Sequence, residues 1–377
     1  MRIHQITAKS ILRRQKKIDS WFLSRYGMNL YRGCSHNCVY CDGRAEKYRV
    51  DGEFGLDVSV KTNALQVLRR ELDPARKRVP FKGGFVLVGG GVCDSYEPVE
   101  AQYRLSRGAL ELLLEFGFPV HLLTKSTLIE RDMELIGQVN EKSRAIVSFS
   151  FSSADDAISA VFEPGVPRPS KRLATLQKFK KAGIACGMFL MPVIPFITDT
   201  PEKMDESVKA ARDAGLDFIV FSGMTLKDGR QKDYFLNVLG RYRPDLVGEY
   251  EVLYSGNQWG EPRSDYMRSI HELFFNIARK YRVPVRIPAR LFSDLLDDND
   301  RVVVMLEQID YVLKMLGRES HYGFAAYSVS QLKEPLAQWR GRLRQLRGIG
   351  PTTERLIHEI LDTGKCSYYD KLVGFSG

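Results

Sequence analysis

Short apolar runs alternate with helical patterns through the first two thirds of the chain. Six runs rich in β-branched and aromatic residues are predicted as strands, at 27–31, 85–89, 119–124, 145–151, 184–191 and 217–222. Amphipathic patterns with helical spacing are predicted as helices, at 61–72, 99–116, 127–140, 170–182 and 202–214. Continuous apolar strands suit a parallel sheet that is buried on both faces. The alternation therefore predicts an α/β fold.

The regions that flank this alternation have different patterns. They divide the chain into an arm, a core, a cap and a tail, at 1–26, 27–222, 223–330 and 331–377. The arm is predicted to be amphipathic, with apolar positions at Ile6, Ile11, Leu12 and Ile18. Two further helical patterns, at 263–282 and 301–317, lie in the cap, which we expect to close the core.

Composition limits the classes of protein to consider. The chain has 377 residues, of which 44% are hydrophobic, as expected of a folded protein with a large core. No apolar run reaches membrane-spanning length, and the basic N-terminus lacks the apolar stretch of a secretory signal. Six cysteines are too few for a disulfide framework in a chain of this length. We therefore expect a cytoplasmic protein without membrane contact.

The charge is unevenly distributed. There are 56 Lys and Arg against 46 Asp and Glu, a formal net charge of +10, which favours a polyanionic partner such as nucleic acid. Basic residues gather near both ends of the chain, at Arg13, Arg14, Lys16 and Lys17, and at Arg340, Arg342, Arg344 and Arg347. On charge alone, two solvated helix faces explain these groups equally well.

Three cysteines follow the first predicted strand at the spacing C-x3-C-x2-C, namely Cys34, Cys38 and Cys41. Three thiolates on one loop match three corners of a [4Fe–4S] cluster and leave one iron open for a substrate or cofactor. The alternative is zinc, which takes four ligands, so His36, Asp42 or a distant cysteine would have to complete the set. The close triplet after a strand favours the cluster.

This loop, with Tyr40 before its third cysteine, resembles the signature of the radical S-adenosylmethionine (SAM) superfamily. Within it, the chain resembles the branch of spore photoproduct lyase and the DNA repair photolyase-like proteins. The resemblance covers most of residues 1–320 and implies an open (β/α)6 partial barrel, with fewer units than a closed eightfold barrel. It implies a [4Fe–4S] cluster and SAM as cofactors, and a one-electron reductant such as flavodoxin or ferredoxin. The reduced cluster would cleave SAM to a 5′-deoxyadenosyl radical that abstracts hydrogen from the substrate.

Residues at the C-terminal ends of the strands are candidates for SAM binding, because parallel α/β sheets place their chemistry there. Three consecutive glycines, Gly89, Gly90 and Gly91, offer free N–H groups after the second strand, where the resemblance places the SAM amino group. The other cofactor-binding candidates are Asp94, Lys125, Ser150 and Arg172. The alternatives are an ordinary glycine turn and structural hydrogen bonds or salt bridges.

Cys93 and Tyr96 are the candidate catalytic residues. Spore photoproduct lyases use a cysteine in this strand-end region as a hydrogen-atom donor, two positions further upstream. A shift of two keeps the same strand face, although a buried, inert thiol is an equally good interpretation of Cys93. Tyr96 belongs to a run, 94–100, that resembles the matching segment of the photolyase-like family. The lyase has a tyrosine directly after its third cysteine, and because Asp42 stands here, its tyrosine-assisted relay does not carry over.

Residues 343–361 near the C-terminus resemble a helix-hairpin-helix motif. Gly348 and Gly350 would form the hairpin, and Pro351 suits the first position of the second helix. Free N–H groups there bind nucleic-acid phosphate without reading sequence, and Arg344 and Arg347 would assist. The alternative is a hairpin used for protein contact.

Together these patterns predict a radical SAM enzyme that acts on nucleic acid. The resemblance suggests DNA repair by a lesion-reversing, lyase-like reaction. One alternative is a radical SAM enzyme that modifies RNA, a peptide or a small molecule. The other is a non-catalytic DNA-binding protein with a structural metal.

Overall fold

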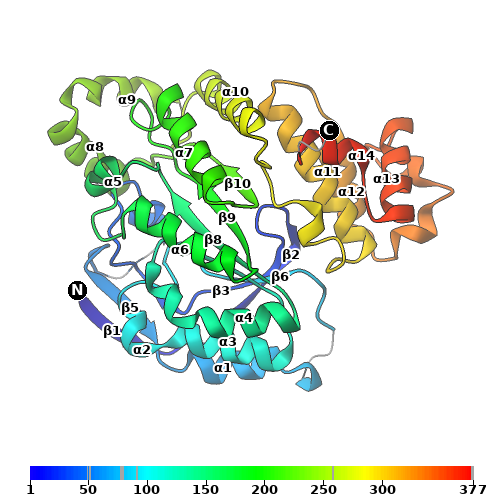
Figure 1. Ribbon diagram of the computed structural model, residues 1–377, viewed down its shortest axis with the longest axis horizontal. Coiled ribbons are helices and arrows are strands. Elements are labelled where there is room, and N and C mark those ends of the chain that lie inside the picture. The colour runs from blue at the N-terminus through cyan, green and yellow to red at the C-terminus, as the bar shows by residue number, and fades with distance from the viewer. Residues whose placement is uncertain (49, 51, 77–79, 91, 257–258, 375–377) are drawn as a thin grey trace.

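A computed structural model describes residues 1–48, 50, 52–76, 80–90, 92–256 and 259–374 (Figure 1). Its main sheet has seven strands in the order β10-β9-β8-β7-β6-β3-β2. All neighbours are parallel except β2 and β3. The strands are β2 (Leu12–Asp19), β3 (Ser24–Met28), β6 (Phe85–Val88), β7 (Val120–Thr124), β8 (Ala145–Phe151), β9 (Ala185–Leu190) and β10 (Phe218–Phe221).

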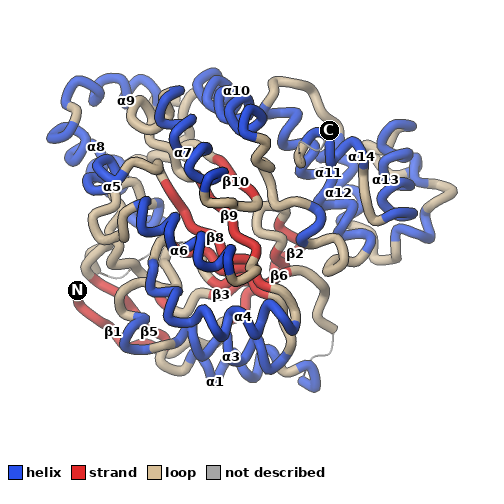
Figure 2. Tube along the Cα trace, viewed as in Figure 1, coloured by secondary structure: helices blue, strands red, loops and turns tan. Residues whose placement is uncertain are grey.

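Helices surround this sheet, as Figure 2 shows by the blue tubes around the red strands. The outer layer contains α1 (Ala64–Leu72), α3 (Leu105–Phe116), α4 (Met133–Lys142), α6 (Pro169–Lys181), α7 (Pro201–Asp213) and α10 (Ser264–Tyr281). Six parallel strands, each followed by helical chain, form an open (β/α)6 partial barrel. The predicted fold class is confirmed, and the last five predicted strands agree with β6–β10 to within a residue or two.

The first predicted strand and the arm are placed differently from expectation. Residues 27–31 are divided, because β3 ends at Met28 and the short β4 (Tyr31–Arg32) is an edge strand of a second sheet of order β1-β5-β4. The arm supplies β1 (Arg2–Ile6), which pairs with β5 (Asp57–Lys61), and β2. The start of β3 has no apolar pattern to predict it, because it contains the charged Arg25. That buried charge is balanced by Asp300, which is distant in sequence.

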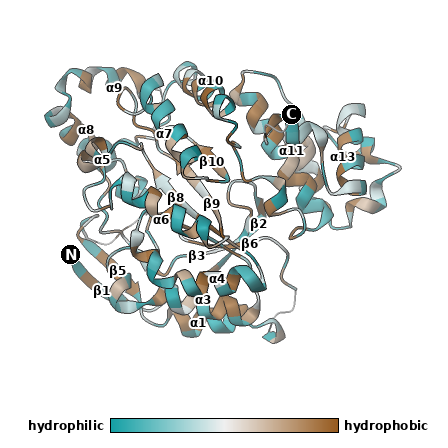
Figure 3. Cartoon of the chain, in the orientation of Figure 1, coloured by the Kyte–Doolittle hydropathy of each residue, from teal (hydrophilic) through white to brown (hydrophobic). Residues whose placement is uncertain are grey.

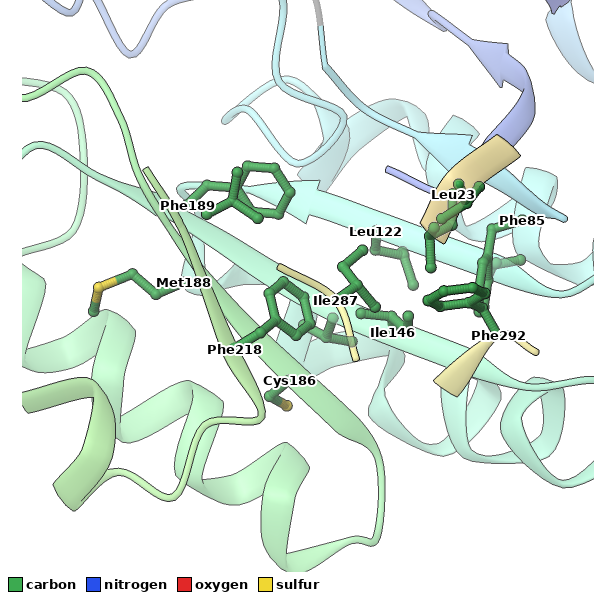
Figure 4. Close-up of a cluster of buried hydrophobic side chains, with 14 of the residues drawn as sticks. Leu23, Phe85, Leu122, Ile146, Cys186, Met188, Phe189, Phe218, Ile287 and Phe292 are labelled. Carbon is green, nitrogen blue, oxygen red and sulfur yellow. The ribbon is translucent and has the colours of Figure 1, made fainter. Parts of the chain in front are cut away.

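The N-terminal end of the barrel is filled with apolar side chains. Phe85 and Phe218 are the first residues of their strands, and Figure 4 shows Phe85 beside Leu23 and Phe218 beside Ile287. Ile287, beyond α10, projects into the same cluster, as does Phe292. All of these side chains are fully buried. This end is therefore closed by packing, and any ligand must enter at the C-terminal ends of the strands.

Helix α11 (Asp298–Met315) spans the gap between the two edges of the sheet. Its Tyr311 hydroxyl donates to the Phe221 carbonyl of β10 at 3.2 Å. One turn earlier, the Gln308 amide donates to the Ser20 carbonyl, just after β2, at 2.9 Å. The buried ion pair of Asp300 with Arg25 adds a third tie. The open side of the partial barrel is thus covered by one helix.

The C-terminal helices pack mainly onto α11. They are α12 (Tyr322–Ser330), α13 (Pro351–Thr363) and α14 (Ser367–Leu372), to the right of the barrel in Figure 1. Residues of opposite hydropathy alternate along α13 in Figure 3, and its buried side includes Ile357 and Ile360. Tyr369 of α14 donates to Gln308 of α11 at 2.6 Å. These contacts join α11 to helices on both sides of residue 330, and the predicted boundary there stays a prediction.

The remaining α-helices of the described residues are α2 (Glu100–Tyr103), α5 (Asp156–Phe162), α8 (Arg230–Tyr242) and α9 (Val247–Leu253). Helices α8 and α9 bury Phe235, Leu239 and Tyr250 in a second apolar cluster that includes Cys38, Val39 and Tyr40. This helix pair covers the cysteine loop. Within the described part of the chain, no helix combines the length and apolar composition that crossing a membrane requires.

Candidate cluster and cofactor site

The cysteine loop leaves the sheet after β4 through a tight turn at Gly33. Gly33 has φ +80°, and a Cβ there would lie 2.5 Å from the Asp57 carbonyl oxygen, so a larger residue would not fit. Cys34 and Cys38 are buried, and Cys41 is partly exposed. The loop is thus held close to β5 and presents its thiols inward.

The three thiols lie within electrostatic range of one another. Burial raises the pKa of all three, to about 12 for Cys38. The charges of Glu97, Asp94, Cys38 and Cys41 also raise the pKa of Cys34. Buried thiolates that repel one another are stabilised when a cation binds them. The donor set therefore fits a group that brings positive charge to three thiolates at once, as an iron–sulfur cluster does.

A cluster of this kind does not require the ligands to meet at a point. Across the described residues, no three His, Cys, Asp or Glu side chains converge as ligands of a single ion would. In a cubane each thiolate binds its own iron, so wider spacing is compatible with it.

Glu163, at the end of α5, anchors the loop from the opposite side of the site. The Tyr40 hydroxyl and the Arg172 guanidinium both donate to its buried carboxylate, and Ser159 does so at 2.9 Å. Burial alone would raise the pKa of Glu163, but Arg172, Lys125 and these hydrogen bonds lower it to about 2. Nearby, the Val39 amide donates to the Phe162 carbonyl at 2.8 Å. The second and third cysteines are therefore fixed to the β8–α6 connection.

Two of the predicted SAM contacts belong to this anchor. Arg172 is fully buried, and besides Glu163 it donates to the Ser150 carbonyl of β8 at 2.5 Å. This placement makes Arg172 a positioning residue, while the Ser150 side chain remains partly exposed. A direct contact of either residue with SAM stays a prediction.

Lys125, directly after β7, is the cation of this region best placed for a ligand. Its Nζ atom is buried and has no hydrogen-bond partner within the described residues. It lies 3.4 Å from a Glu163 oxygen and 5.7 Å from the centre of the Tyr40 ring. An ammonium that is buried without a hydrogen bond is ready to bind an incoming carboxylate. A contact of Lys125 with the SAM carboxylate stays a prediction.

The glycine turn after β6 allows a close backbone approach. Gly89 has φ +113°, and a Cβ there would lie 2.3 Å from the Leu123 carbonyl oxygen. Gly90 also has positive φ, at +87°. Gly91, the third predicted contact, lies outside the described residues. Both described glycines thus adopt conformations that other residues rarely take.

Asp94 connects three parts of the site. Its carboxylate accepts from the Tyr96 amide at 2.8 Å, the Thr124 hydroxyl at 2.6 Å and the Lys125 amide at 2.7 Å. His36 of the cysteine loop lies 3.4 Å from the same carboxylate. With these partners, Asp94 holds β6, β7 and the loop together, and its contact with the cofactor stays a prediction.

Cys93 and Tyr96 occupy different surroundings. Burial raises the pKa of Cys93 to about 12, with a further rise from Glu97, and Lys61 opposes the shift. The charge of Glu97 also raises the pKa of Cys34, so both cysteines lie near this carboxylate. Tyr96 is buried with its hydroxyl next to Asp132, towards the outer helices. A catalytic role for Tyr96 stays a prediction, and this placement indicates a structural one.

A hollow of about 370 Å³ opens at the C-terminal ends of β3 and β6. Its wall includes Gly89 and Gly90 of the turn and Lys61, the neighbour of Cys93. The polar part of the remaining wall comes largely from β2 and its neighbours: Arg13, Gln15, Asp19 and Asn29. Its position and polar lining suit a substrate that carries hydrogen-bonding groups and negative charge.

Hydrogen bonds that no sequence pattern predicts connect the loop to helix α8. Asp42 accepts from Thr225 and Lys227, each at 2.8 Å. Gln231 of α8 donates to the Tyr40 carbonyl at 3.0 Å. The partners are more than 180 residues apart, so no local signal in the sequence could have revealed them.

The predicted hairpin lies where expected, between the short turn at 343–345 and α13. Gly348 has φ +83°, and α13 begins at Pro351 with Gly350 as its N-cap. Arg344 is paired with Glu354 at 2.6 Å, so its charge is partly neutralised. Arg347 is exposed, and its guanidinium lies 5.7 Å from the centre of the Phe324 ring.

Comparisons with known proteins agree with this geometry. The Radical SAM superfamily matches residues 28–204, and a helix-hairpin-helix domain matches residues 297–366. An uncharacterised protein of Mycobacterium tuberculosis is 32% identical over 284 residues, covering 74% of this chain and 81% of the relative. An uncharacterised protein of Methanocaldococcus jannaschii is 27% identical over 214 residues, covering 56% and 75%.

A solved structure shares the fold. Spore photoproduct lyase complexed with dinucleoside spore photoproduct has a TM-score of 0.56 and 16% sequence identity, covering 74% of this chain and 79% of that one. The superfamily match includes the cysteine loop, the glycine turn and Lys125, and the second match includes α11, α12 and α13. The chain therefore belongs to the radical SAM superfamily, as an enzyme that carries a C-terminal helix-hairpin-helix domain.

Proposed function

We propose that this radical SAM enzyme acts on nucleic acid, and that its reaction is a lyase-like reversal of a lesion in DNA. One observation carries the proposal. The hollow at the ends of β3 and β6 shares Lys61 with the charged surroundings of Cys93 and shares Gly89 and Gly90 with the predicted SAM site. A substrate in this hollow would lie between the cofactor and a thiol.

Cys34, Cys38 and Cys41 would hold a [4Fe–4S] cluster, and Gly89, Gly90 and Lys125 would hold SAM. When bound, these cofactors supply a carbon-centred radical that removes a hydrogen atom from the substrate. The chain's own residues provide the surroundings. The Glu163 anchor and Asp94 fix the loop and the glycine turn relative to each other, and α8 and α9 exclude water from the loop.

Cys93 would return a hydrogen atom to the substrate. Its buried thiol is held in the protonated form, because burial raises its pKa to about 12. A protonated thiol has the S–H bond that such a transfer needs, whereas a thiolate does not. The proposed role therefore agrees with the surroundings of Cys93.

Two observations support nucleic acid as the substrate class. The helix-hairpin-helix domain leaves the Gly350 end of α13 exposed, beside Arg347, and such helix starts bind phosphate. Strand β2 adds exposed cations at the hollow and its edge. Spore photoproduct lyase, which shares the fold, was solved with a dinucleoside photoproduct, so photoproduct DNA is the first substrate to test.

Electrons would come from a small reductant such as flavodoxin or ferredoxin, and we propose a cytoplasmic location.

The test is anaerobic reconstitution with iron and sulfide, followed by reduction with dithionite in the presence of SAM. Ultraviolet-irradiated DNA, unirradiated DNA and RNA oligonucleotides are supplied separately, and products are identified by mass spectrometry. Restoration of normal thymidine from irradiated DNA alone supports the proposal. A new product on unirradiated RNA, or SAM cleavage without change to any oligonucleotide, contradicts it and favours an RNA, peptide or small-molecule substrate.

A further inference from the structure

We propose that α12 and the adjoining hairpin form a binding site for unpaired bases, in which Phe324 and Tyr327 stack on a single strand of nucleic acid. The inference rests on the proposed function and adds to it the form of nucleic acid that is bound and the path that it takes. It assigns a role to α12, whose side chains take no part in the site described above.

Helix α12 is apolar on two faces. Ala325, Ala326 and Val329 are buried against the domain. Phe324 is 57% exposed and Tyr327 is 60% exposed, although large aromatic side chains are normally buried. They are three residues apart in the helix, so their rings lie on the same exposed face. Two neighbouring exposed rings are the arrangement with which proteins stack on successive unpaired bases.

The hairpin packs directly against these residues. A Cβ on Gly348 would lie 2.9 Å from both the Phe324 Cβ and the Ala325 amide nitrogen. The Ser328 hydroxyl donates to the Arg347 carbonyl at 2.8 Å. The hairpin and the aromatic face therefore form one surface, with a phosphate-binding turn beside the two rings.

Arg347 adds a charge to this surface. Its guanidinium lies 5.7 Å from the centre of the Phe324 ring, and no carboxylate lies within ion-pair distance of it in the described part of the chain. A guanidinium stacked on a ring contacts a phosphate and a base together. Arg344, by contrast, is paired with Glu354.

The surface continues to the barrel. Gly323, next to Phe324, lines a hollow of about 460 Å³ together with Gln15 and Lys17 of β2. Gln15 also lines the substrate hollow at the ends of β3 and β6. Two of the acidic residues in the connecting hollow are paired, Glu307 with Lys17 and Asp310 with Lys314, and the third, Asp19, accepts from the Trp21 and Phe22 amides. A strand held at the hairpin thus has a continuous path to the site.

The occupant inferred is a nucleic-acid strand and not a protein. Arg13, Arg14 and Lys16 are exposed on β2 and have no carboxylate within ion-pair distance among the residues that the structure describes. An anionic backbone complements these cations and Arg347, while bases complement the rings. A duplex keeps its bases stacked on each other, so only unpaired bases are free to use Phe324 and Tyr327.

The experiment measures the affinity of the whole enzyme for a fluorescein-labelled oligothymidylate and for a blunt duplex of equal length, by anisotropy at two salt concentrations. The variant Phe324→Leu with Tyr327→Leu keeps an apolar helix surface and removes both rings. We expect it to bind the single strand about tenfold more weakly or worse. Duplex affinity should change less than about twofold, and the salt dependence should stay the same because no charge is altered.

Two further variants separate the effect of these rings from that of another exposed ring and from that of charge. Tyr242→Leu removes a partly exposed ring from α8, far from α12 in Figure 1, and should leave both affinities unchanged. Arg347→Gln should lower the salt dependence of binding. Equal single-strand affinities of the wild type and the double variant, with both folded by circular dichroism, overturn the stacking site but leave the proposed reaction intact. Absence of salt-dependent binding by the wild type to either oligonucleotide overturns both.

Discussion

The Asp42 carboxylate accepts a hydrogen bond from Lys227 Nζ at 2.8 Å and so joins the cysteine loop to the chain that enters α8. Burial alone would raise the pKa of Asp42, but Lys227, Thr225 and Gln231 hold it below its ordinary value. Asp42, directly after the third cysteine of the loop, therefore has a structural partner in the chain that enters α8.

Replacing Asp42 should loosen the cysteine loop. Asp42→Ala leaves the largely buried Lys227 ammonium without its carboxylate partner, so we expect a loss of about 1–3 kcal/mol in unfolding free energy and lower iron retention. Asp228→Asn, which alters an exposed pair with Lys232, is the matched control and should change neither quantity. Thermal unfolding and iron content after reconstitution measure the effect. Unchanged iron and stability in Asp42→Ala would show that the tie is unimportant.

The three loop cysteines should each be indispensable for the cluster. Alanine at Cys34, Cys38 or Cys41 removes one of three thiolate ligands, so iron binding and SAM cleavage should both be lost. Cys186 and Cys366 are also buried but lie elsewhere, and their alanine variants should keep full iron content. Iron and sulfide analysis of anaerobic protein decides the matter. Stoichiometric zinc without iron in the wild type would contradict the assignment.

Cys93 should affect the product and not the cluster. Because Cys93 lies by Lys61 and the substrate hollow, Cys93→Ala should retain iron and SAM cleavage within about twofold while changing the yield or identity of the product. Mass spectrometry of the oligonucleotide product and of 5′-deoxyadenosine separates the two readouts. Loss of iron in this variant would place Cys93 in the cluster site.

Gly350 is the informative position for testing the hairpin. A side chain at Gly350 meets no atom within 4 Å, whereas one at Gly348 would strain the hairpin against α12. Gly350→Glu should weaken nucleic-acid binding about tenfold, or 1.4 kcal/mol, by adding a negative charge at the start of α13. Gly350→Ala, the uncharged control, should bind nearly as the wild type does. Equal affinities for Gly350→Glu and Gly350→Ala would exclude phosphate contact there.

The buried His121 should make stability fall in mild acid. Burial lowers the pKa of His121 to about 4, and its ring contacts the Phe22 carbonyl and Ser148 inside the barrel. Below pH 6.5 the unfolded chain takes up a proton that the folded chain refuses, so stability is complete above pH 6.5 and is lost as the pH falls towards 4. The slope from His121 is about 1.4 kcal/mol per pH unit. Denaturant unfolding at several pH values should show a shallower slope in His121→Gln, with the remaining slope including that of His271. Equal slopes would contradict the prediction.

The amino-acid sequence by itself determined the features that depend on local order. Apolar runs predicted β6–β10, because strands buried on both faces need uninterrupted apolar residues. The three loop cysteines lie within eight residues of one another, and the two hairpin glycines lie within three. Their spacing alone therefore indicated a cluster loop and a helix-hairpin-helix. What only tertiary structure decided depends on partners far apart in sequence. The charge of Arg25 is balanced by Asp300, and that of Asp42 by Lys227. Phe324 becomes part of a surface only when the hairpin packs against it. The role of a buried charge or an exposed ring depends on its spatial neighbours, and these are set by the fold and not by the order of residues in the chain.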